Sequence, residues 1–541
     1  MNEADLIDTE ATVASPAAED AGRRLSWFRV FLVVVVVAAS VAGIWYYQRQ
    51  QAEDTAAASA VPSWFAPYVD VTSTPSYAFE DVADRTNSSA VLAFVVSAPG
   101  APCDPSWGGA YSMTAAAGQL DLDRRIARLR QLGGTVSVSF GGAANSELAI
   151  GCIDPAALTA AYASVVDRYA LSEIDLDIEG QASMAPEVNQ RRAAAIAALS
   201  QQQQAAGKTL DVWLTLPVIS TGLTEDGRAV LASMLAAGVR PAGVNAMTMD
   251  YGEPIPEGRG MADQGELAIT ALQQQIRDAY GAAGADLTDA QAWGLVGATP
   301  MIGQNDIPSE VFTLDDAAQL LAFAQQHKLG RLSMWSANRD QSCGPNYPDV
   351  TVVSDVCSGI AQQPGAFAAI LGQFGAGQPP HTSAPATPPS TTGSIVPTVP
   401  TAPTGGTATE IVDDPATSPY QIWNPNQGYP KGSKVVWHRN VYQAKWYSQG
   451  DRPDQPVATA DQTPWTLIGP VLPGDTPAPT PTLPAGTYPE WSPTEVYVAG
   501  SRVLHDGIGW QAGFWSQGDV PGAVPTSPDD ISPWQLILEP S

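Results

Sequence analysis

The chain has 541 residues, of which 55 are Asp or Glu and 26 are Lys or Arg, so its formal net charge is −29. A chain of this length is expected to form about two to four domains. The negative charge argues against nucleic acid or an anionic membrane surface as a partner and suits a neutral polymer. Only four histidines occur, so neither a Ser-His-Asp hydrolase nor a His-ligated zinc site is easily built. We expect carboxylate chemistry without a metal or cofactor.

The N-terminal part predicts a membrane anchor. Residues 1–25 are polar and acidic and are expected to be disordered. Residues 26–47 hold an apolar run about as long as a membrane-spanning helix requires. A spacer is expected at 48–63.

The charges around this run predict its orientation. Arg23, Arg24 and Arg29 lie before its core, and only Arg49 follows closely. By the positive-inside rule the N-terminus is then cytoplasmic and the rest of the chain is extracellular. The alternative is a cleaved signal peptide, with small residues at 38–42 as the cleavage site, and a secreted protein.

The four cysteines form an even set without a Cys-x-x-Cys motif. Four cysteines allow three pairings, and sequence proximity favours Cys103–Cys152 and Cys343–Cys357. Buried free thiols would be the alternative in a reducing compartment, which the predicted export makes unfavourable.

Residues 64–377 alternate short β-rich runs with Ala-rich helical stretches. The expected strands are Phe65–Val71, Val91–Val96, Thr135–Phe140, Ile174–Ile178, Leu210–Leu216, Gly243–Met249, Ala292–Pro300 and Leu332–Trp335. Helices are expected at Arg124–Leu132, Pro155–Tyr169, Glu187–Ala206, Gly227–Ala237 and Leu314–His327. Eight strand–helix units predict an α/β domain of the (β/α)8 TIM-barrel type, with a doubly wound sheet as the alternative.

Three carboxylates mark the predicted active site. Asp175, Asp177 and Glu179 alternate with apolar residues, so they share one face of a strand. Carboxylates this close repel one another, which should raise the pKa of at least one of them. A protonated acid beside ionised carboxylates is the arrangement needed to cleave a glycosidic bond.

Two motifs resemble those of the family eighteen glycoside hydrolases, the chitinase family. Asp175, Asp177 and Glu179 match the last three acids of Asp-Gly-x-Asp-x-Asp-x-Glu, although Ser172-Glu173 replaces Asp-Gly. Ser139-Phe140-Gly141-Gly142 matches Ser-x-Gly-Gly, which makes Ser139, Gly141 and Gly142 candidate site residues. The order of the motifs suits the third and fourth strands of one barrel.

The resemblance implies substrate-assisted hydrolysis with retention of configuration. Glu179 would serve as general acid and then as base, while the substrate's own N-acetyl group attacks the anomeric carbon. Asp177 would orient that group, and Asp175 would set the ionisation of Asp177.

Further positions would shape the site. The family's sixth strand ends Met-x-Tyr-Asp; here Met249 takes the tyrosine position and Asp250 matches, so Tyr251 is the candidate for the missing hydroxyl. Trp335 matches the tryptophan that floors the sugar site. Asp306 would either bind substrate hydroxyls or cap a helix.

The C-terminal part has a different composition. Residues 378–417 and 472–486 are Pro-rich linkers. The segments between and after them, 418–471 and 487–541, form an internal repeat with a constant offset of 68 residues (491 − 423 = 514 − 446 = 68). Each copy is too small for a large core and is expected to be an all-β module.

Both copies resemble the chitin- and cellulose-binding modules of carbohydrate-binding families five and twelve. The family's Ala-x-Trp-Trp motif reads Ala444-Lys445-Trp446-Tyr447 and Ala512-Gly513-Phe514-Trp515. Adjacent aromatics on a strand point to opposite faces, so one ring of each pair can lie in the core and the other can face the sugar. The resemblance implies that the second ring, Tyr447 or Trp515, is the exposed one, with Tyr442 and Trp510 as companions. The candidate binding aromatics are Tyr442, Trp446, Tyr447, Trp510, Phe514 and Trp515.

The sequence therefore predicts a chitinase. It would be a monomer, anchored in the membrane and active on chitin or N-acetylglucosamine oligomers. An endo-β-N-acetylglucosaminidase with the same barrel is one alternative. A catalytically silent chitin-binding adhesin is the other.

Overall fold

The computed structural model describes residues 64–81, 89–347, 349–375, 411–457, 459–477, 482–523 and 532–537. The predicted tail at 1–25, anchor at 26–47 and spacer at 48–63 lie outside these residues. Within the described ranges no helix is both long and apolar enough to cross a bilayer.

Parallel strands form a closed barrel. The first strand has two pieces: β1 (Trp64–Phe65) pairs with the last strand, and β2 (Tyr68–Asp70) pairs with the second, which closes the sheet on itself. The other barrel strands are β3 (Ser89–Ala98), β6 (Thr135–Gly141), β7 (Glu173–Asp177), β8 (Asp211–Ile219), β10 (Gly243–Met247), β11 (Val296–Thr299) and β14 (Arg331–Leu332). The predicted TIM barrel is confirmed. A doubly wound sheet is wrong, because such a sheet has open edges.

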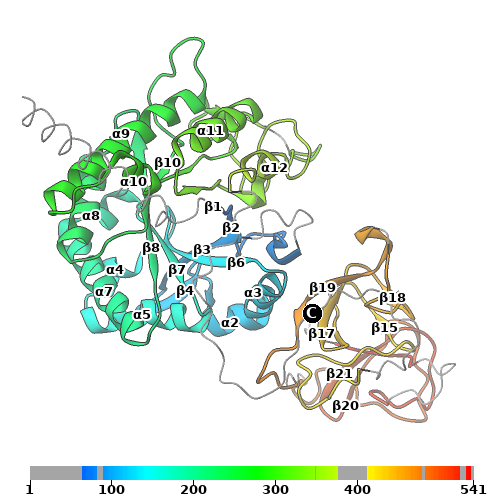
Figure 1. Cartoon of the computed structure of the whole chain (residues 1–541). Helices are drawn as coiled ribbons and strands as arrows, with labels where there is room; N and C mark the ends of the chain where they lie inside the picture. The colour runs from blue at the N-terminus through cyan, green and yellow to red at the C-terminus, as the bar shows by residue number, and fades with distance from the viewer. Residues whose placement is uncertain are drawn as a thin grey trace, which may run out of the picture. The chain divides into compact units, whose positions relative to one another are not determined.

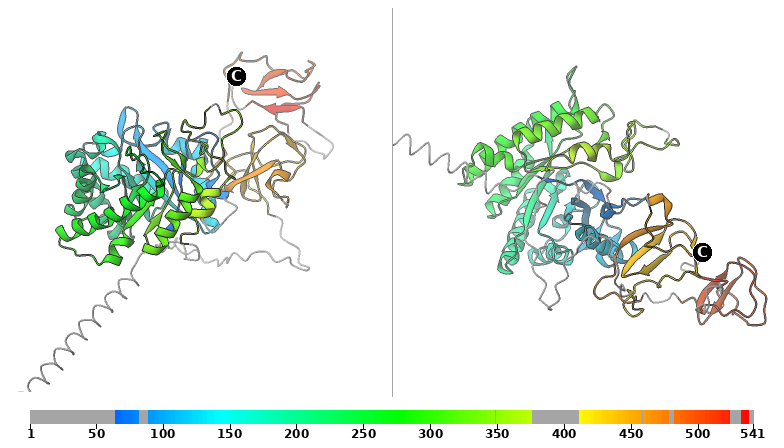
Figure 2. Two further views of the ribbon diagram at one scale, coloured as in Figure 1. Left: turned by 90° about the horizontal axis from the view of Figure 1, so that it is seen from above. Right: turned by 45° about the vertical axis from the view of Figure 1, so that its right-hand side comes forward.

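Helices form a layer around these strands (Figure 1), and the turned views show the same arrangement (Figure 2). They are α2 (Met113–Gln119), α3 (Leu122–Gln131), α4 (Leu148–Gly151), α5 (Pro155–Arg168), α6 (Gly180–Met184), α7 (Pro186–Ala205), α8 (Glu225–Ala236), α9 (Met261–Ala282), α10 (Asp289–Gly294), α11 (Leu314–His327) and α12 (Ala366–Leu371), with 3-10 turns η1 (Phe79–Asp81) and η3 (Ala337–Arg339). Several begin where a side chain accepts a hydrogen bond from the first turn, as Asp154, Thr224 and Thr313 do.

Short strands decorate the barrel: β4 (Ala101–Trp107), β5 (Tyr111–Ser112), β9 (Gly222–Leu223), β12 (Gly303–Gln304) and β13 (Val311–Phe312). One predicted strand is partly wrong. Residues 292–294, expected to open the strand Ala292–Pro300, belong to α10 instead, because Thr288 and Gln291 form a capping box that starts a helix there.

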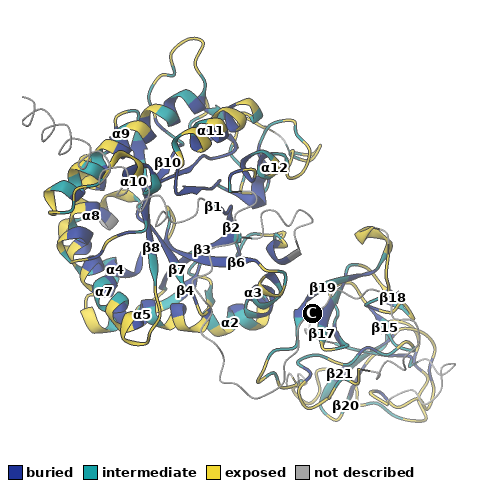
Figure 3. Cartoon of the chain, viewed as in Figure 1, coloured by how far each residue is buried: buried dark blue, intermediate teal, exposed yellow. Residues whose placement is uncertain are grey.

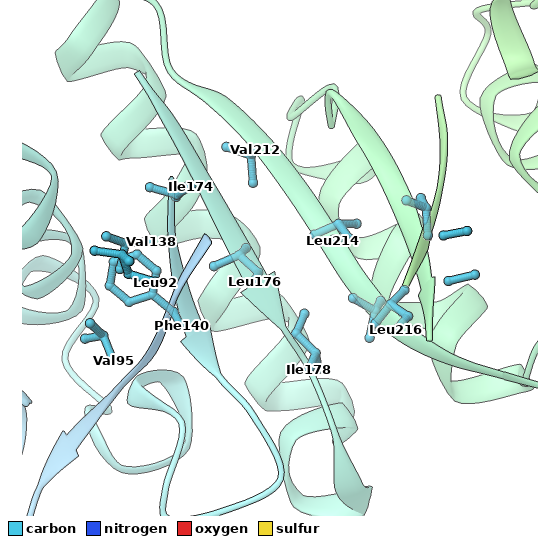
Figure 4. Packing of buried hydrophobic residues seen from close by; sticks show 14 of the residues in the cluster. Leu92, Val95, Val138, Phe140, Ile174, Leu176, Ile178, Val212, Leu214 and Leu216 are labelled. Carbon is cyan, nitrogen blue, oxygen red and sulfur yellow. The ribbon is translucent and has the colours of Figure 1, made fainter. Parts of the chain in front are cut away.

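The core lies between the barrel and its helices. Figure 3 shows buried strands and helices whose outer faces are exposed. Ile174, Leu176 and Ile178 of the carboxylate segment are at most 1% exposed and pack with the apolar side chains of neighbouring strands, among them Val138 and Leu214 (Figure 4). The apolar half of this segment therefore anchors it, and its acidic half is left to face the barrel interior.

Both predicted disulfides are present. Cys103 pairs with Cys152, and Cys343 pairs with Cys357. The second bridge closes a loop that follows the last barrel strand.

Each C-terminal segment contains a small antiparallel sheet, as the repeat predicted. The first has β16 (Lys434–Trp437), β17 (Asn440–Ala444) and β19 (Trp465–Pro470), with the pair β15 (Gly428–Tyr429) and β18 (Ser448–Gln449) and the turn η4 (Ala460–Gln462). The second has β20 (Arg502–His505), β21 (Ile508–Ala512) and β22 (Trp534–Leu536).

The two modules use equivalent internal contacts. The indole N–H of Trp465 donates to the Asp451 carbonyl at 2.9 Å, and that of Trp534 donates to the Asp519 carbonyl at 2.7 Å. Tyr429 and Trp465 pack edge-to-face in one copy, as do Tyr497 and Trp534 in the other. The sequence repeat is therefore also a structural repeat.

Candidate active site

The three carboxylates stand at the carboxyl end of the fourth barrel strand. Asp175 and Asp177 lie on β7 and are 0% and 5% exposed, while Glu179 follows the strand in extended conformation immediately before α6. In parallel α/β barrels this end of the strands carries the active site.

Asp175 is held by four donors. Its Oδ2 accepts hydrogen bonds from the Tyr68 hydroxyl at 2.9 Å and the Ser139 hydroxyl at 2.7 Å. Its Oδ1 accepts from the Thr215 hydroxyl and from Arg331 Nη1, both at 2.7 Å. Each oxygen of Asp175 therefore accepts two hydrogen bonds, which fixes the carboxyl in place.

Asp177 and Glu179 hydrogen-bond to one another. Burial raises the pKa of Asp177 well above its ordinary value, and the nearby charges of Glu179 and Asp175 raise it further. Burial also raises the pKa of Glu179, with contributions from Asp250 and Asp306, although the bond to Asp177 opposes the shift. This pair can hold a proton nearer neutrality than ordinary carboxyls can.

A cavity of about 370 Å³ opens above these groups. Both Asp177 and Glu179 line it, and the remaining walls come from loops at the same end of the barrel. Its other lining residues include Tyr68, Asp70, Phe94, Asn145, Thr215, Met249, Asp250, Asp306, Trp335, Val353 and Asp355. Oδ1 of Asp177 is buried and has no hydrogen-bond partner among the described residues.

The Ser-x-Gly-Gly segment lets the third strand approach the fourth. Ser139 is paired with Asp175, and Gly141 with Asp177. A Cβ atom on Gly141 would lie 2.0 Å from the Asp177 carbonyl oxygen, and one on Gly142 would lie 2.9 Å from the Phe94 ring. Both glycines also have positive φ. None of Ser139, Gly141 and Gly142, predicted as substrate-binding residues, is among the residues that line the cavity. They instead position Asp175 and Asp177 from the neighbouring strand.

The sixth strand contributes Met249 and Asp250, but not Tyr251. Tyr251 does not line the cavity, and its hydroxyl lies toward Gly265 of α9, on the outside of the barrel. Its backbone N–H donates to Glu310 Oε2 at 3.0 Å. The prediction that Tyr251 supplies the missing hydroxyl is wrong, because the loop turns its side chain outward.

Trp335 and Asp306 both line the cavity as predicted for substrate contacts. Trp335 stacks on Phe94 with ring centroids 5.3 Å apart. The helix-cap alternative for Asp306 is wrong, since Thr313 is the N-cap of the following helix α11.

Sequence reasoning missed Tyr68, Thr215 and Arg331. Tyr68 and Thr215 lie within predicted strands, and alternation along those strands could have placed them inside the barrel. The signal for Arg331 is a charged residue at the start of an apolar strand, where burial requires a partner.

The aromatic residues of the modules differ from the prediction. Both members of each motif pair are exposed: Trp446 by 44%, Tyr447 by 55%, Phe514 by 46% and Trp515 by 60%. The two rings of each pair do not point to opposite faces, because β17 ends at Ala444 and β21 ends at Ala512. Both pairs therefore lie just after a strand, where side chains no longer alternate.

Tyr442 and Trp510 are not exposed binding rings. Tyr442 is buried in the core cluster of the first module. Trp510 is partly buried and packs against the core of the second. Of the six candidate aromatics, the four exposed rings are therefore those of the two motif pairs.

A closed (β/α)8 barrel with clustered acids at its catalytic end defines the carboxylate glycosidase class of site. Comparisons with known proteins agree with it. Over 294 residues the chain is 37% identical to a probable bifunctional chitinase/lysozyme of Escherichia coli, covering 52% of this chain and 31% of that protein. It is 36% identical over 283 residues to endochitinase 11 of Metarhizium anisopliae, covering 51% of this chain and 52% of that protein. The chain thus spans about half or less of these relatives' lengths.

A solved structure supports the same likeness. Active domain 2 of a thermostable chitinase from Pyrococcus furiosus, crystallised as catalytic-site mutants with chito-oligosaccharides, is 28% identical with a TM-score of 0.50. The match covers 58% of this chain and 94% of that domain. Residues 490–535 match the family model of carbohydrate-binding module family 5/12. The predicted resemblance to chitinases with such a module is confirmed.

Proposed function

We propose that the chain is a chitinase that hydrolyses β-1,4-linked N-acetylglucosamine polymers with retention of configuration. The observation that carries the proposal is the pairing of Glu179 with Asp177 in the cavity, where Asp177 keeps one buried oxygen without a partner. The similarity of the barrel to a domain solved with chito-oligosaccharides supports the choice of substrate.

In the first step, Glu179 donates its proton to the glycosidic oxygen and the C1–O bond breaks. The carbonyl oxygen of the substrate's 2-acetamido group forms a new bond to C1, which gives a cyclic oxazolinium ion. Asp177, which lines the cavity, accepts a hydrogen bond from the acetamido N–H, and its negative charge offsets the developing positive charge. Trp335, stacked on Phe94, provides an apolar floor for the sugar ring.

In the second step, the Glu179 carboxylate takes a proton from water, and the water oxygen attacks C1 from the side that the leaving group vacated. The C1 bond to the acetamido oxygen breaks. Two inversions at C1 give net retention. The raised pKa of Glu179 keeps the acid protonated nearer neutrality, so activity should fall as pH rises through that pKa.

The test uses the part of the chain from about residue 55, incubated with N-acetylglucosamine oligomers. We expect shorter oligomers by mass spectrometry and an initial β-anomer by NMR. Glu179→Gln should lower the rate by several orders of magnitude while binding to chitin remains. Product with an α-anomer would contradict the mechanism.

A second candidate is a catalytically silent chitin-binding protein. It is favoured by one observation: Met249 occupies the wall position of the family tyrosine, and the hydroxyl of Tyr251 faces α9 instead. Absence of products from the unaltered chain, with chitin pull-down intact, would establish this alternative.

We further propose that the modules hold the enzyme on chitin through the exposed pairs Trp446–Tyr447 and Phe514–Trp515. Flat exposed rings suit stacking on sugar faces. For the first module the proposal is supported by its structural equivalence to the second, which carries the family match.

For location, we propose a monomer with a single-pass anchor at 26–47 and the barrel outside the cell. The apolar run and its flanking arginines support this topology. Protease added to intact cells should remove the barrel and leave a short membrane-bound fragment. Activity in the medium of unwashed cells, with none in membranes, would instead indicate cleavage and secretion.

A further inference from the structure

Arg331 is a buried cation beneath the catalytic carboxylates. It lies on β14, its side chain is 0% exposed, and its Nη1 pairs with Asp175 Oδ1 at 2.7 Å. Its guanidinium lies 5.2 Å from the ring of Trp64, 5.3 Å from that of Tyr68 and 5.5 Å from that of Trp213. A buried charge in such surroundings is stable only when it is well paired.

Asp175 is the carboxyl that hydrogen-bonds to Arg331, and the Glu173 carboxyl on the same strand also acts on the guanidinium, since each of the two raises the pKa of Arg331. Nε and Nη2 have no hydrogen-bond partner among the described residues and face the aromatic cage. Arginine cannot lose its proton in a protein, so its charge is permanent. The pair therefore fixes the position of the Asp175 carboxyl.

The geometry around Asp175 leaves no room for proton sharing. Each of its oxygens already accepts two hydrogen bonds, with Arg331 and Thr215 on one and Tyr68 and Ser139 on the other. Asp177 cannot bond to Asp175 without displacing one of these donors. It turns to Glu179 instead.

We propose that Arg331 is a positioning residue of the active site: together with the other donors it occupies the oxygens of Asp175, which removes that carboxyl as a partner for Asp177 and presets Asp177 toward Glu179. The inference rests on the proposed glycosidase function. Arg331 does not touch the cavity and acts only through Asp175.

The consequence is a specific pH effect. Arg331 lowers the pKa of Asp177, against the larger effects of burial and of the Glu179 and Asp175 charges. Removing it should raise that pKa further. Because Asp177 must be ionised to offset the developing positive charge, the acid limb of the pH profile should then move to higher pH.

The experiment measures kcat and KM across pH 4–9 with an N-acetylglucosamine oligomer. We expect Arg331→Met to move the acid limb up by about one pH unit and to lower kcat at least tenfold with little change in KM. Arg331→Lys, which keeps the charge, should leave the limb near its original place.

Arg192→Met is the matched control. Arg192 is also 0% exposed and pairs with the buried Glu147 at 3.0 Å, but neither residue lines the cavity. This variant should lose stability without moving the acid limb. An equal shift of the limb in both variants would overturn the proposal.

A double variant tests whether Arg331 acts through Asp175. Arg331→Met combined with Asp175→Asn removes both charges of the pair, so it should fold better than Arg331→Met alone. Its kcat should be no lower than that of Asp175→Asn alone. Multiplying losses would mean that Arg331 acts by another route.

A readout without turnover separates this proposal from the proposed function. Carboxyl ¹³C NMR on labelled protein should show Asp177 titrating at higher pH in Arg331→Met than in the unaltered chain. If the unaltered chain does not cleave chitin oligomers, the proposed function fails but this titration still decides the role of Arg331. An unchanged Asp177 titration would overturn it.

Discussion

At the residue scale, the active site depends on two acids that differ in what surrounds them. Asp175 has four donors, one of them a permanent cation. Asp177, two residues further along the same face, has a carboxyl partner and one oxygen without a partner among the described residues. Alternation along β7 places both carboxyl groups on the same face of the strand. Their roles differ because different side chains from other strands contact them.

This difference predicts a stability effect at Asp177. Its pKa is raised in the folded chain, so the folded state binds that proton more tightly than the unfolded state does. The group therefore favours folding below its ordinary pKa, and this contribution is lost as pH rises through the raised pKa. Near neutral pH, burial of the Asp177 carboxyl therefore lowers the free energy of unfolding of the chain.

Asp177→Asn should abolish activity and raise Tm at pH 7–8, by about 2–4 °C for each 1 kcal/mol gained. The gain should shrink as pH falls toward 4 and vanish below it, where the acid becomes protonated in the unfolded state as well. Thermal unfolding at several pH values checks this. Asp349→Asn is the control, because the pKa of the exposed Asp349 is lowered by its bond to Thr351 and no gain is expected. A Tm difference independent of pH would contradict the prediction.

At the element scale, the loop closed by Cys343–Cys357 forms part of the cavity wall. It carries Val353 and Asp355, both of which line the cavity. A disulfide restricts the conformations open to such a loop. The bridge is therefore expected to support substrate binding as well as stability.

Replacing Cys343 and Cys357 by Ser should raise KM several-fold with a smaller change in kcat, because the loop wall loses its fixed position. A closed loop of this size contributes up to about 3 kcal/mol. Steady-state kinetics with chitin oligomers measures the effect. The paired control replaces Cys103 and Cys152, which do not line the cavity, and should lower Tm without changing KM. Equal KM effects in both variants would refute the assignment.

At the scale of the whole molecule, one catalytic barrel is joined to two small binding modules by Pro-rich linkers. Each module has its own small core and presents an exposed aromatic pair. Two tethered modules that reach one lattice bind more tightly than either does alone. The role that we propose for the repeat is to hold an acidic enzyme on an uncharged solid.

Tyr447→Ala or Trp515→Ala in the full chain should each weaken binding to insoluble chitin by about 10–100-fold if both modules engage together. Binding isotherms decide this. If the modules act as separate sites, each variant should halve the capacity and leave Kd unchanged. Val498→Ala, which alters an exposed apolar residue of the second module, should do neither.

The sequence by itself determined the class of fold, the acid cluster and both disulfides. Those features are local: period-two alternation sets which residues share a face, and motif spacing orders the third and fourth strands. At residues 292–294 the error concerned only the boundary of an element, whereas the helix α9 and the strand β4 were not among the predicted elements.

Only the tertiary structure decided how the site is completed. Tyr68, Thr215 and Arg331 reach Asp175 from strands 107, 40 and 156 residues away in the chain. Barrel closure brings such strands together, and no local pattern specifies it. The orientation of Tyr251 and the exposure of both rings in each module pair likewise depend on where a strand ends. Beyond that point the backbone bends, and side chains no longer alternate between two faces.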